Sequence, residues 1–112
     1  MSGNQSNILI ATRWLEDGFN KRNLDLFLSL LADDFIHHGF GLNLEAFKAS
    51  RRELFPQLPA AALVTIEDRL CEGDKVAIRL TYREPDHEPR TELLLFHLRD
   101  GKITDIWNCF MH

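Results

Sequence analysis

The stretch Val76-Ala77-Ile78-Arg79-Leu80-Thr81-Tyr82-Arg83 decides the fold class of this chain. Its large apolar side chains recur at every second position, and Arg79, Thr81 and Arg83 lie between them. Because successive side chains of a β-strand point to opposite faces, this period of two predicts a strand with one buried face. The inner row of that strand should contain Val76, Ile78, Leu80 and Tyr82.

A tight turn precedes this strand and joins it to another one. Glu72-Gly73-Asp74 combines glycine with short polar side chains, which is typical of a hairpin turn. The segment that starts at Ala62 also has a period of two, and we expect one face of it to carry Val64, Ile66 and Leu70. The two strands should therefore pair antiparallel.

Two further strands follow the polar loop from Glu84 to Pro89. We expect them over Arg90 to Arg99 and over Ile103 to Phe110, joined by a hairpin turn at Asp100-Gly101. In the first strand, the period of two predicts an inner row of Glu92, Leu94, Phe96 and Leu98. In the second strand, we expect Ile106, Asn108 and Phe110 to point inward, and Ile103, Asp105, Trp107 and Cys109 to point outward.

The first half of the chain has a helical period instead. Apolar residues recur every three or four positions from Ile8 to Phe19. Two more helices should begin after Asn23 and Asn43, because asparagine can accept a hydrogen bond from the free amides of the next turn. A short extended piece, Phe35 to His38, lies between them. Three helices followed by an antiparallel meander predict an α+β fold.

The composition limits the possible functions. The chain has 112 residues, 45% of them hydrophobic, which suits one domain over residues 1–112 with a single core. Its formal net charge is -4 without a basic stripe, so we expect no nucleic-acid partner. No apolar run is long enough to span a membrane, and the first residues lack the pattern of a secretory signal. We therefore expect a cytoplasmic protein in which Cys71 and Cys109 are free thiols.

The outer face of the expected sheet is also apolar. Leu93, Leu95, His97 and Trp107 should point away from the helices. An antiparallel strand that is apolar on both faces usually has a layer packed on each. Because no helix remains to cover this face, we expect a homodimer that forms through it.

Five segments resemble the SnoaL-like branch of the nuclear-transport-factor-2-like superfamily, which also includes ketosteroid isomerases and limonene epoxide hydrolases. They are Phe19 to Asp25, Leu31 to Phe35, Leu44 to Lys48, Glu67 to Val76, and Asp100 to Ile103 followed by Trp107. The resemblance implies a cone-shaped half barrel, in which three N-terminal helices pack on a strongly bent antiparallel sheet. It also implies a pocket at the wide end and pairing through the outer face. Family members include isomerases, cyclases, hydrolases and binding modules, so the site must be argued from its own residues.

His37 and Glu92 are the candidate catalytic residues. With Phe35 in the core, the period of two turns His37 inward and His38 outward, so the two histidines are not expected to share a metal ion. Near neutral pH, His37 can act as a general base or a hydrogen-bond donor. Glu92 begins the inner row of its strand, where burial would raise its pKa. Structural roles, as a core histidine and a solvated rim carboxylate, remain the alternatives.

The candidate ligand-binding residues are mostly aromatic: Trp14, Phe40, Phe55, Tyr82, Asn108 and Phe110. They describe a small apolar pocket with a few polar groups. We expect a cofactor-free isomerase, cyclase or lyase that acts on a small apolar carbonyl compound. In it, His37 moves the proton with the assistance of Glu92, while Tyr82 and Asn108 hold the carbonyl oxygen. However, Gly39 or a neighbour occupies the place of the aspartate base of ketosteroid isomerases, and the inner row lacks the Asp-Arg-Asp set of limonene epoxide hydrolases. A non-catalytic binding or dimerisation module is the alternative.

Overall fold

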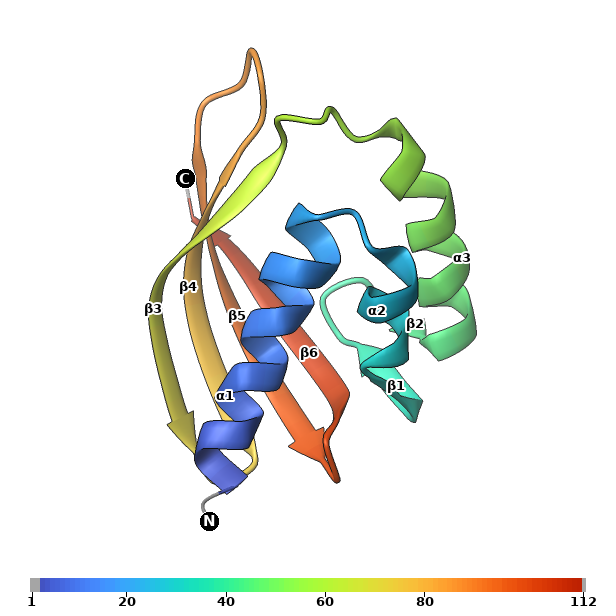
Figure 1. Cartoon of the computed structure of the whole chain (residues 1–112), viewed down its shortest axis with the longest axis vertical. Coiled ribbons are helices and arrows are strands. Elements are labelled where there is room, and N and C mark those ends of the chain that lie inside the picture. Colours follow the sequence, from blue (N-terminus) through green and yellow to red (C-terminus); the bar gives the residue numbers. More distant parts are fainter. Residues whose placement is uncertain (1–2, 112) are drawn as a thin grey trace.

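The computed structural model of this chain describes residues 3–111. Six strands form one open mixed sheet in the order β2-β1-β6-β5-β4-β3, with helices on its concave side (Figure 1). The strands β3 to β6 form the antiparallel meander that the sequence predicts. Their bounds are β1 Leu31–His37, β2 Leu42–Asn43, β3 Leu63–Glu72, β4 Lys75–Arg83, β5 Arg90–Arg99 and β6 Lys102–Met111.

The three predicted helices are present. Helix α1 (Gly3–Arg13) continues into a π-helical segment, η1 (Trp14–Asn20), α2 spans Leu24–Ser29, and α3 (Leu44–Leu54) ends in a short 3-10 turn, η2 (Phe55–Gln57). Asn23 and Asn43 accept hydrogen bonds from the amides of Leu26 and Ala46, at 3.1 and 3.0 Å, so both predicted N-caps are confirmed. Between residues 3 and 111, no helix combines the length and the apolar character that spanning a membrane requires.

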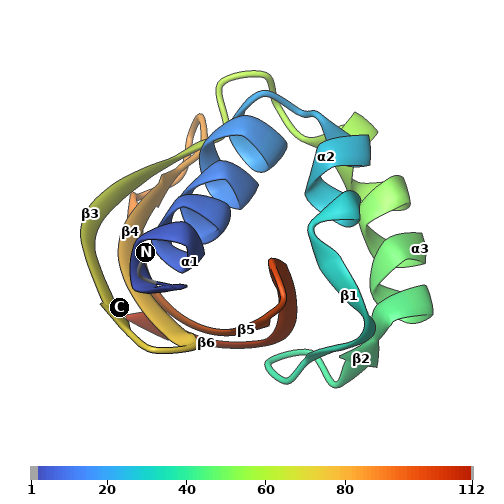
Figure 2. The same ribbon diagram turned by 60° about the horizontal axis from the view of Figure 1, so that its bottom comes forward.

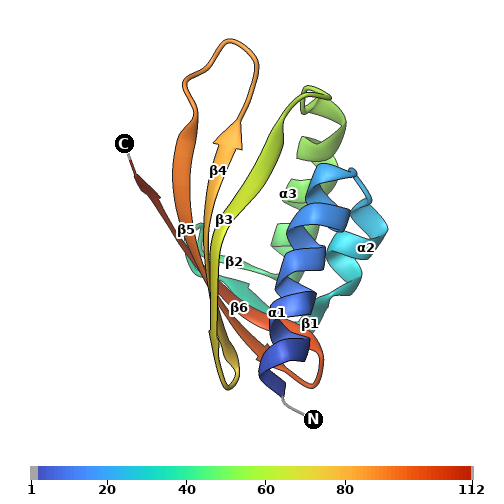
Figure 3. The same cartoon turned by 60° about the vertical axis from the view of Figure 1, so that its left-hand side comes forward.

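The sheet is strongly curved, and α1 lies along its concave face (Figure 2). At one end, the loop between β4 and β5 extends beyond the helical layer (Figure 3). The core lies between the two layers, where Trp14 stacks on Phe27 with ring centroids 4.2 Å apart and donates a hydrogen bond to the Phe27 carbonyl at 2.9 Å. This pair connects η1 to α2 and forms one wall of the space that the curved sheet encloses.

One strand pair departs from the expected antiparallel arrangement. Strand β1 runs parallel to β6, with His37 opposite Ile106, whereas β2 pairs antiparallel with β1. A parallel pair requires a long crossover connection. Here α3 and the strands β3 to β5 supply that connection, so the sheet is mixed.

The predicted inner rows of β4 and β5 are confirmed. Val76, Ile78 and Leu80 are buried, as are Leu94, Phe96 and Leu98, whereas Leu93 and Leu95 are exposed. The turn at Asp100-Gly101 fixes this register, because both residues adopt positive φ angles, of 52° and 79°, as a two-residue hairpin turn requires.

A bulge at Glu67 reverses the expected orientation of Leu70. Ile66 pairs with Leu80, but Asp68 already pairs with Arg79, so the faces exchange beyond this point. As a result, Leu70 is 72% exposed on the outer face. Arg69 lies on the inner side instead and donates a hydrogen bond to Thr12 Oγ1 at 2.9 Å.

A second bulge, at Thr104, reverses the expected orientation of Ile103. Asp105 pairs with His97, but Ile103 pairs with Leu98. The extra residue buries both Ile103 and Thr104. Beyond the bulge, Trp107 is exposed and Ile106 is buried, as predicted.

Candidate functional site

A cavity of about 350 Å³ lies between the concave face of the sheet, η1 and α3. An apolar cavity of this size with a few polar groups is the usual form of a small-molecule site. Its polar lining residues are His37, Arg51, Tyr82, Glu84, Arg90, Glu92 and Asn108. All residues predicted for the site except Phe55 line it, namely Trp14, His37, Phe40, Tyr82, Glu92, Asn108 and Phe110.

Phe55 belongs to the core behind the cavity. It lies at the start of η2, where its side chain points into the helical layer instead of toward the cavity. Its ring packs against Phe27 at 5.0 Å and edge-on against Phe19 at 5.9 Å. Phe55 is therefore not among the residues that line the cavity, and its expected ligand-binding role stays a prediction.

His37, at the end of β1, is only 4% exposed. Its ring stacks between Phe40 and Phe47, with centroid distances of 4.2 and 5.3 Å. Burial, with a smaller contribution from the charge of Arg51, lowers the pKa of His37 to about 4, so the ring is neutral at pH 7. Nδ1 accepts a hydrogen bond from the Phe40 amide at 3.2 Å. The ring proton therefore resides on Nε2, which has no hydrogen-bond partner among residues 3–111.

Glu92 points into the same cavity from β5 and is half-buried. Its Oε2 atom accepts a hydrogen bond from Asn108 Nδ2 at 3.0 Å. Burial raises the pKa of the Glu92 carboxyl, although the bond from Asn108 and the charge of Arg90 oppose this shift. The cavity therefore contains a carboxyl group with increased proton affinity and a neutral histidine that presents an N–H group.

Gly39, in the turn between β1 and β2, packs directly against these groups. A Cβ atom at this position would overlap Asn108 Oδ1 and lie 3.0 Å from His37 Cε1. Asn108 can therefore occupy the space between the turn and Glu92 only because Gly39 has no side chain. An aspartate base at this position, which the sequence lacks, would also collide with Asn108.

Tyr82 and Glu84 form a second polar pair in the cavity lining. The Tyr82 hydroxyl donates a hydrogen bond to Glu84 Oε1 at 2.6 Å. Burial, together with this contact, raises the pKa of Tyr82 to about 12. The guanidinium of Arg90 lies over the rings of Tyr82 and Phe110, at 5.1 and 4.6 Å. Glu84, which is not among the residues predicted for the site, is thus the polar partner of the Tyr82 hydroxyl.

Sequence reasoning also missed Arg51, which lines the cavity from α3. Its guanidinium lies 5.1 Å from the ring centre of Phe47 and 5.7 Å from that of Phe40. A signal for Arg51 was present, because it occupies a helical position within the apolar stripe of Leu44, Phe47 and Leu54. A charge within an apolar stripe marks a residue that faces either the core or a site.

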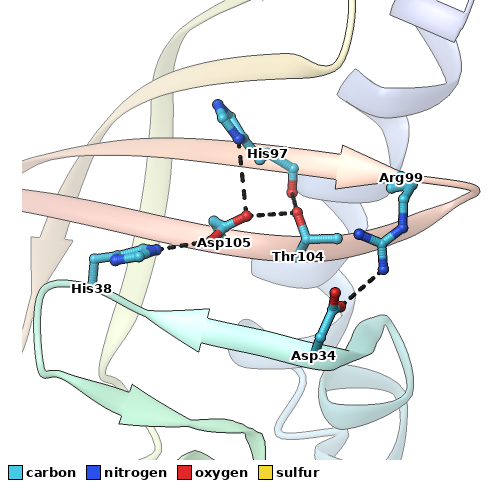
Figure 4. A network of polar contacts seen from close by, with 6 residues as sticks. All are labelled: Asp34, His38, His97, Arg99, Thr104 and Asp105. Atoms are coloured by element: carbon cyan, nitrogen blue, oxygen red, sulfur yellow. Dashed lines mark hydrogen bonds and ion pairs between the residues drawn. The ribbon is translucent and has the colours of Figure 1, made fainter.

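A separate polar network lies on the outer face of the sheet (Figure 4). Asp105 accepts a hydrogen bond from His38 Nε2 at 2.8 Å and another from Thr104 Oγ1 at 2.8 Å, and His97 Nδ1 lies 3.9 Å from its second oxygen. The His38 ring stacks on Trp107 at 4.3 Å. This network and the exposed leucines Leu93 and Leu95 lie on the surface opposite the cavity.

The described residues contain no group of three or more His, Cys, Asp or Glu side chains that could hold a metal ion. His37 and His38 point to opposite faces, one into the cavity and one toward Asp105. No disulfide joins Cys71 and Cys109 in the described part of the chain.

Comparison with known families identifies the fold. The family model of the SnoaL-like domain matches residues 11–106, which include η1, α2, α3 and all the cavity-lining residues except Asn108 and Phe110. The chain belongs to the SnoaL-like family. A search of curated proteins found no significant match.

Solved SnoaL-like and ketosteroid-isomerase-like structures share this architecture. A candidate ketosteroid isomerase from Kribbella flavida superposes with a TM-score of 0.82 at 17% identity, covering 100% of this chain and 82% of that one. An LEH-like epoxide hydrolase from M. tuberculosis gives 0.78 at 16% identity, covering 97% and 85%. A candidate SnoaL-like polyketide cyclase from Jannaschia gives 0.74 at 21% identity, covering 96% and 86%. These SnoaL-like relatives establish the fold and differ from one another in activity.

Proposed function

We propose that this SnoaL-like protein binds a small, mostly apolar carbonyl compound and transfers a proton at the carbon next to the carbonyl group. The observation that supports this proposal is the pairing of Glu92 with His37 in one cavity. The Glu92 carboxyl has a raised proton affinity, and the neutral His37 ring presents a free N–H group. Proton abstraction next to a carbonyl needs both functions, a base and a donor to the developing oxyanion.

Glu92 is the proposed base, and His37 is the proposed donor. With a pKa of about 4 and its Nδ1 lone pair occupied by the Phe40 amide, His37 is a poor proton acceptor at pH 7. Its Nε2–H group is free to donate. This division of roles differs from the sequence-based expectation, in which His37 moved the proton and Glu92 assisted.

The proposed step needs no further reactant, because the proton and the electron pair move only between the substrate and Glu92. The Glu92 carboxylate accepts the proton, the electron pair of the broken C–H bond moves toward the carbonyl carbon, and the carbonyl oxygen becomes an enolate oxygen. The Nε2–H group of His37 donates a hydrogen bond to that oxygen. In a substrate with a carbon–carbon double bond conjugated to this enolate, return of the proton from Glu92 to the γ-carbon isomerises the substrate. Asn108 cannot transfer a proton, and we assign it the positioning of Glu92 through the 3.0 Å hydrogen bond.

Deuterium exchange tests this proposal without knowledge of the natural substrate. Phenylacetone, acetophenone and cyclohexanone are incubated with the protein in D₂O at neutral pH, and loss of the α-proton signal is followed by NMR. We expect accelerated exchange with at least one ketone, and Glu92→Gln should reduce it by about 100-fold or more. Glu88→Gln, in the exposed loop after β4, is the matched control. Equal exchange rates in the wild type and Glu92→Gln would refute the proton-transfer role.

A non-catalytic binding module is the second candidate function. The observation in its favour is that the polar groups of the cavity bind one another: the Tyr82 hydroxyl donates to Glu84, and Asn108, an amide that transfers no proton, donates to Glu92. Saturable ketone binding, measured by calorimetry, without any α-proton exchange would favour this function.

We also propose that a second copy of the chain covers the outer face of the sheet. This face contains a hollow of about 490 Å³, and most of its lining is apolar, including Leu70, Leu93, Leu95 and Trp107, while Asp68 and Arg79 also contribute to it. The adjacent charges are already paired, Arg79 with Asp68 at 2.6 Å and His38 with Asp105 at 2.8 Å. An uncharged, apolar centre matches another copy of itself better than it matches a charged partner.

Sedimentation analysis tests the proposed dimer. The wild type should sediment with twice the mass of one chain, and Leu95→Glu should shift the protein to single chains. Leu9→Glu is the control, because Leu9 is an exposed leucine on α1 away from this face. A wild type that sediments as a single chain at high micromolar concentration would contradict the dimer.

A further inference from the structure

We propose that the ligand of the cavity carries one carboxylate group, which Arg51 binds, next to an apolar body. This inference rests on the proposed function, because both use the same cavity, and it narrows the substrate to an acid that also contains a carbonyl group. It predicts a binding preference that is measurable without turnover.

The side chain of Arg51 lacks an anionic partner within the described part of the chain. The arginine–carboxylate pairs between residues 3 and 111 involve Arg13, Arg79 and Arg99. Of the Arg51 nitrogens, Nη2 donates to Ser50 Oγ at 2.8 Å, and Nε is buried without a hydrogen-bond partner. Nε is enclosed by the protein, so the nitrogen open to a ligand is Nη1, which makes no hydrogen bond to residues 3–111. An unpaired guanidinium nitrogen in a cavity wall indicates a missing acceptor.

Two aromatic rings hold the guanidinium in place. Phe47 and Phe40 lie under it at 5.1 and 5.7 Å, and the same two rings stack on His37. Burial disfavours the charged form of Arg51 and lowers its pKa. A carboxylate would restore the lost stabilisation, because a guanidinium binds this group through two parallel hydrogen bonds.

The rest of the cavity argues for a single anionic group. Glu84 and Glu92 also line it and would repel a second negative charge. The other lining arginine, Arg90, is exposed, and its charge already acts on Glu92 and Tyr82. Most of the remaining lining is apolar, including Leu15, Leu54, Leu58 and Val64, which suits a hydrocarbon body.

The first experiment compares acids with neutral compounds of the same shape on the wild type. Phenylacetate, hydrocinnamate and hexanoate are titrated by calorimetry at low salt and neutral pH, and each is compared with its primary amide. We expect the acids to bind about tenfold more tightly than the amides, as a charge-assisted hydrogen-bond pair implies. Equal affinities of acid and amide, or no binding of any acid, would overturn the inference.

Two adjacent arginines on α3 supply a matched pair of variants. Arg51→Gln should remove the preference for the acid, whereas Arg52→Gln should retain it, because Arg52 is exposed and does not line the cavity. Retained preference in Arg51→Gln would overturn the inference. If Arg51→Gln does not fold, Arg51→Lys replaces it: the preference should fall but not vanish, since lysine keeps the charge and loses the planar fork.

The outcomes separate this inference from the proposed proton transfer. Preferred acid binding without α-proton exchange in the ketones or in a keto acid such as levulinate would support the carboxylate site and refute catalysis by Glu92. Ketone exchange that depends on Glu92, without a preference for acids, would support the catalysis and refute the carboxylate site.

Discussion

Gly39 and Asn108 touch so closely that no side chain fits at position 39 unless the amide moves. The same amide holds Glu92 in place. A turn at the end of β1 is therefore mechanically linked to the proposed base on β5, through one side chain on β6. This link allows the geometry of Glu92 to be perturbed without altering Glu92 itself.

Gly39→Ala should displace Asn108 and thereby weaken the hydrogen bond to Glu92. We expect a loss of roughly 1 to 3 kcal/mol in the free energy of unfolding, the usual cost of overpacking, and slower ketone exchange. Denaturant unfolding and NMR exchange measure these effects. Combining Gly39→Ala with Asn108→Ala should recover part of the stability, because the clash is gone. Strictly additive losses would argue against the contact.

The stability of the protein should fall at mildly acidic pH because of His37. Its pKa is about 4 in the folded state and 6.5 ordinarily, so the unfolded chain binds a proton first as the pH falls. This stabilisation is complete above pH 6.5 and is lost between pH 6.5 and 4. We expect a loss of about 2 kcal/mol between pH 7 and 5 from this group. Urea unfolding at each pH should show a flatter dependence for His37→Gln, and parallel curves would contradict this.

Tyr82 should ionise only in strongly alkaline solution. It is the only tyrosine of the chain, so the absorbance of its phenolate can be titrated without interference from another tyrosine. We expect a midpoint near pH 12, as burial and Glu84 imply. Glu84→Gln should lower the midpoint, since the neighbouring negative charge is removed. A wild-type midpoint near the ordinary value of 10.0 would show that the hydroxyl is solvated.

Asn20 should stabilise the fold, because its side chain makes the two hydrogen bonds to Val64 that a neighbouring strand would otherwise make. Its side chain donates to the Val64 carbonyl and accepts from the Val64 amide, both at 2.9 Å, and so joins the end of η1 to β3. Asn20→Ala leaves the N–H and C=O groups of the buried residue Val64 without these partners. This should lower the free energy of unfolding by about 2 kcal/mol. The measurement is the unfolding free energy, with Glu16→Ala, at an exposed position of η1, as the control substitution. Equal effects of the two substitutions would contradict this role.

The sequence predicted those features that depend on repeating patterns. The inner row of Leu94, Phe96 and Leu98 follows from alternation, and the start of α3 follows from the capping ability of Asn43. The period of two also turned Glu92 inward, which placed it in the cavity lining. These features are local, so a single chain segment contains the information that determines them.

The features that were missed depend on contacts between distant segments. Nothing in the local pattern marks the bulges that reversed Leu70 and Ile103, because a bulge adds one residue to an otherwise regular alternation. The tautomer of His37 depends on its bond to Phe40, which only the folded turn creates. Arg51 had a readable signal, a charge within an apolar stripe, but its lack of an ion pair is visible only in three dimensions.

The parallel pairing of β1 with β6 has a consequence for the timing of assembly during synthesis. His37 is synthesised before the strand beside it, β6, because α3 and the strands β3 to β5 lie between them in the sequence. The helical half can form local structure while the chain grows, but the histidine gains its neighbour only after β6 has been made. The site should therefore be absent from nascent chains that end before residue 102 and should arise in the final folding step.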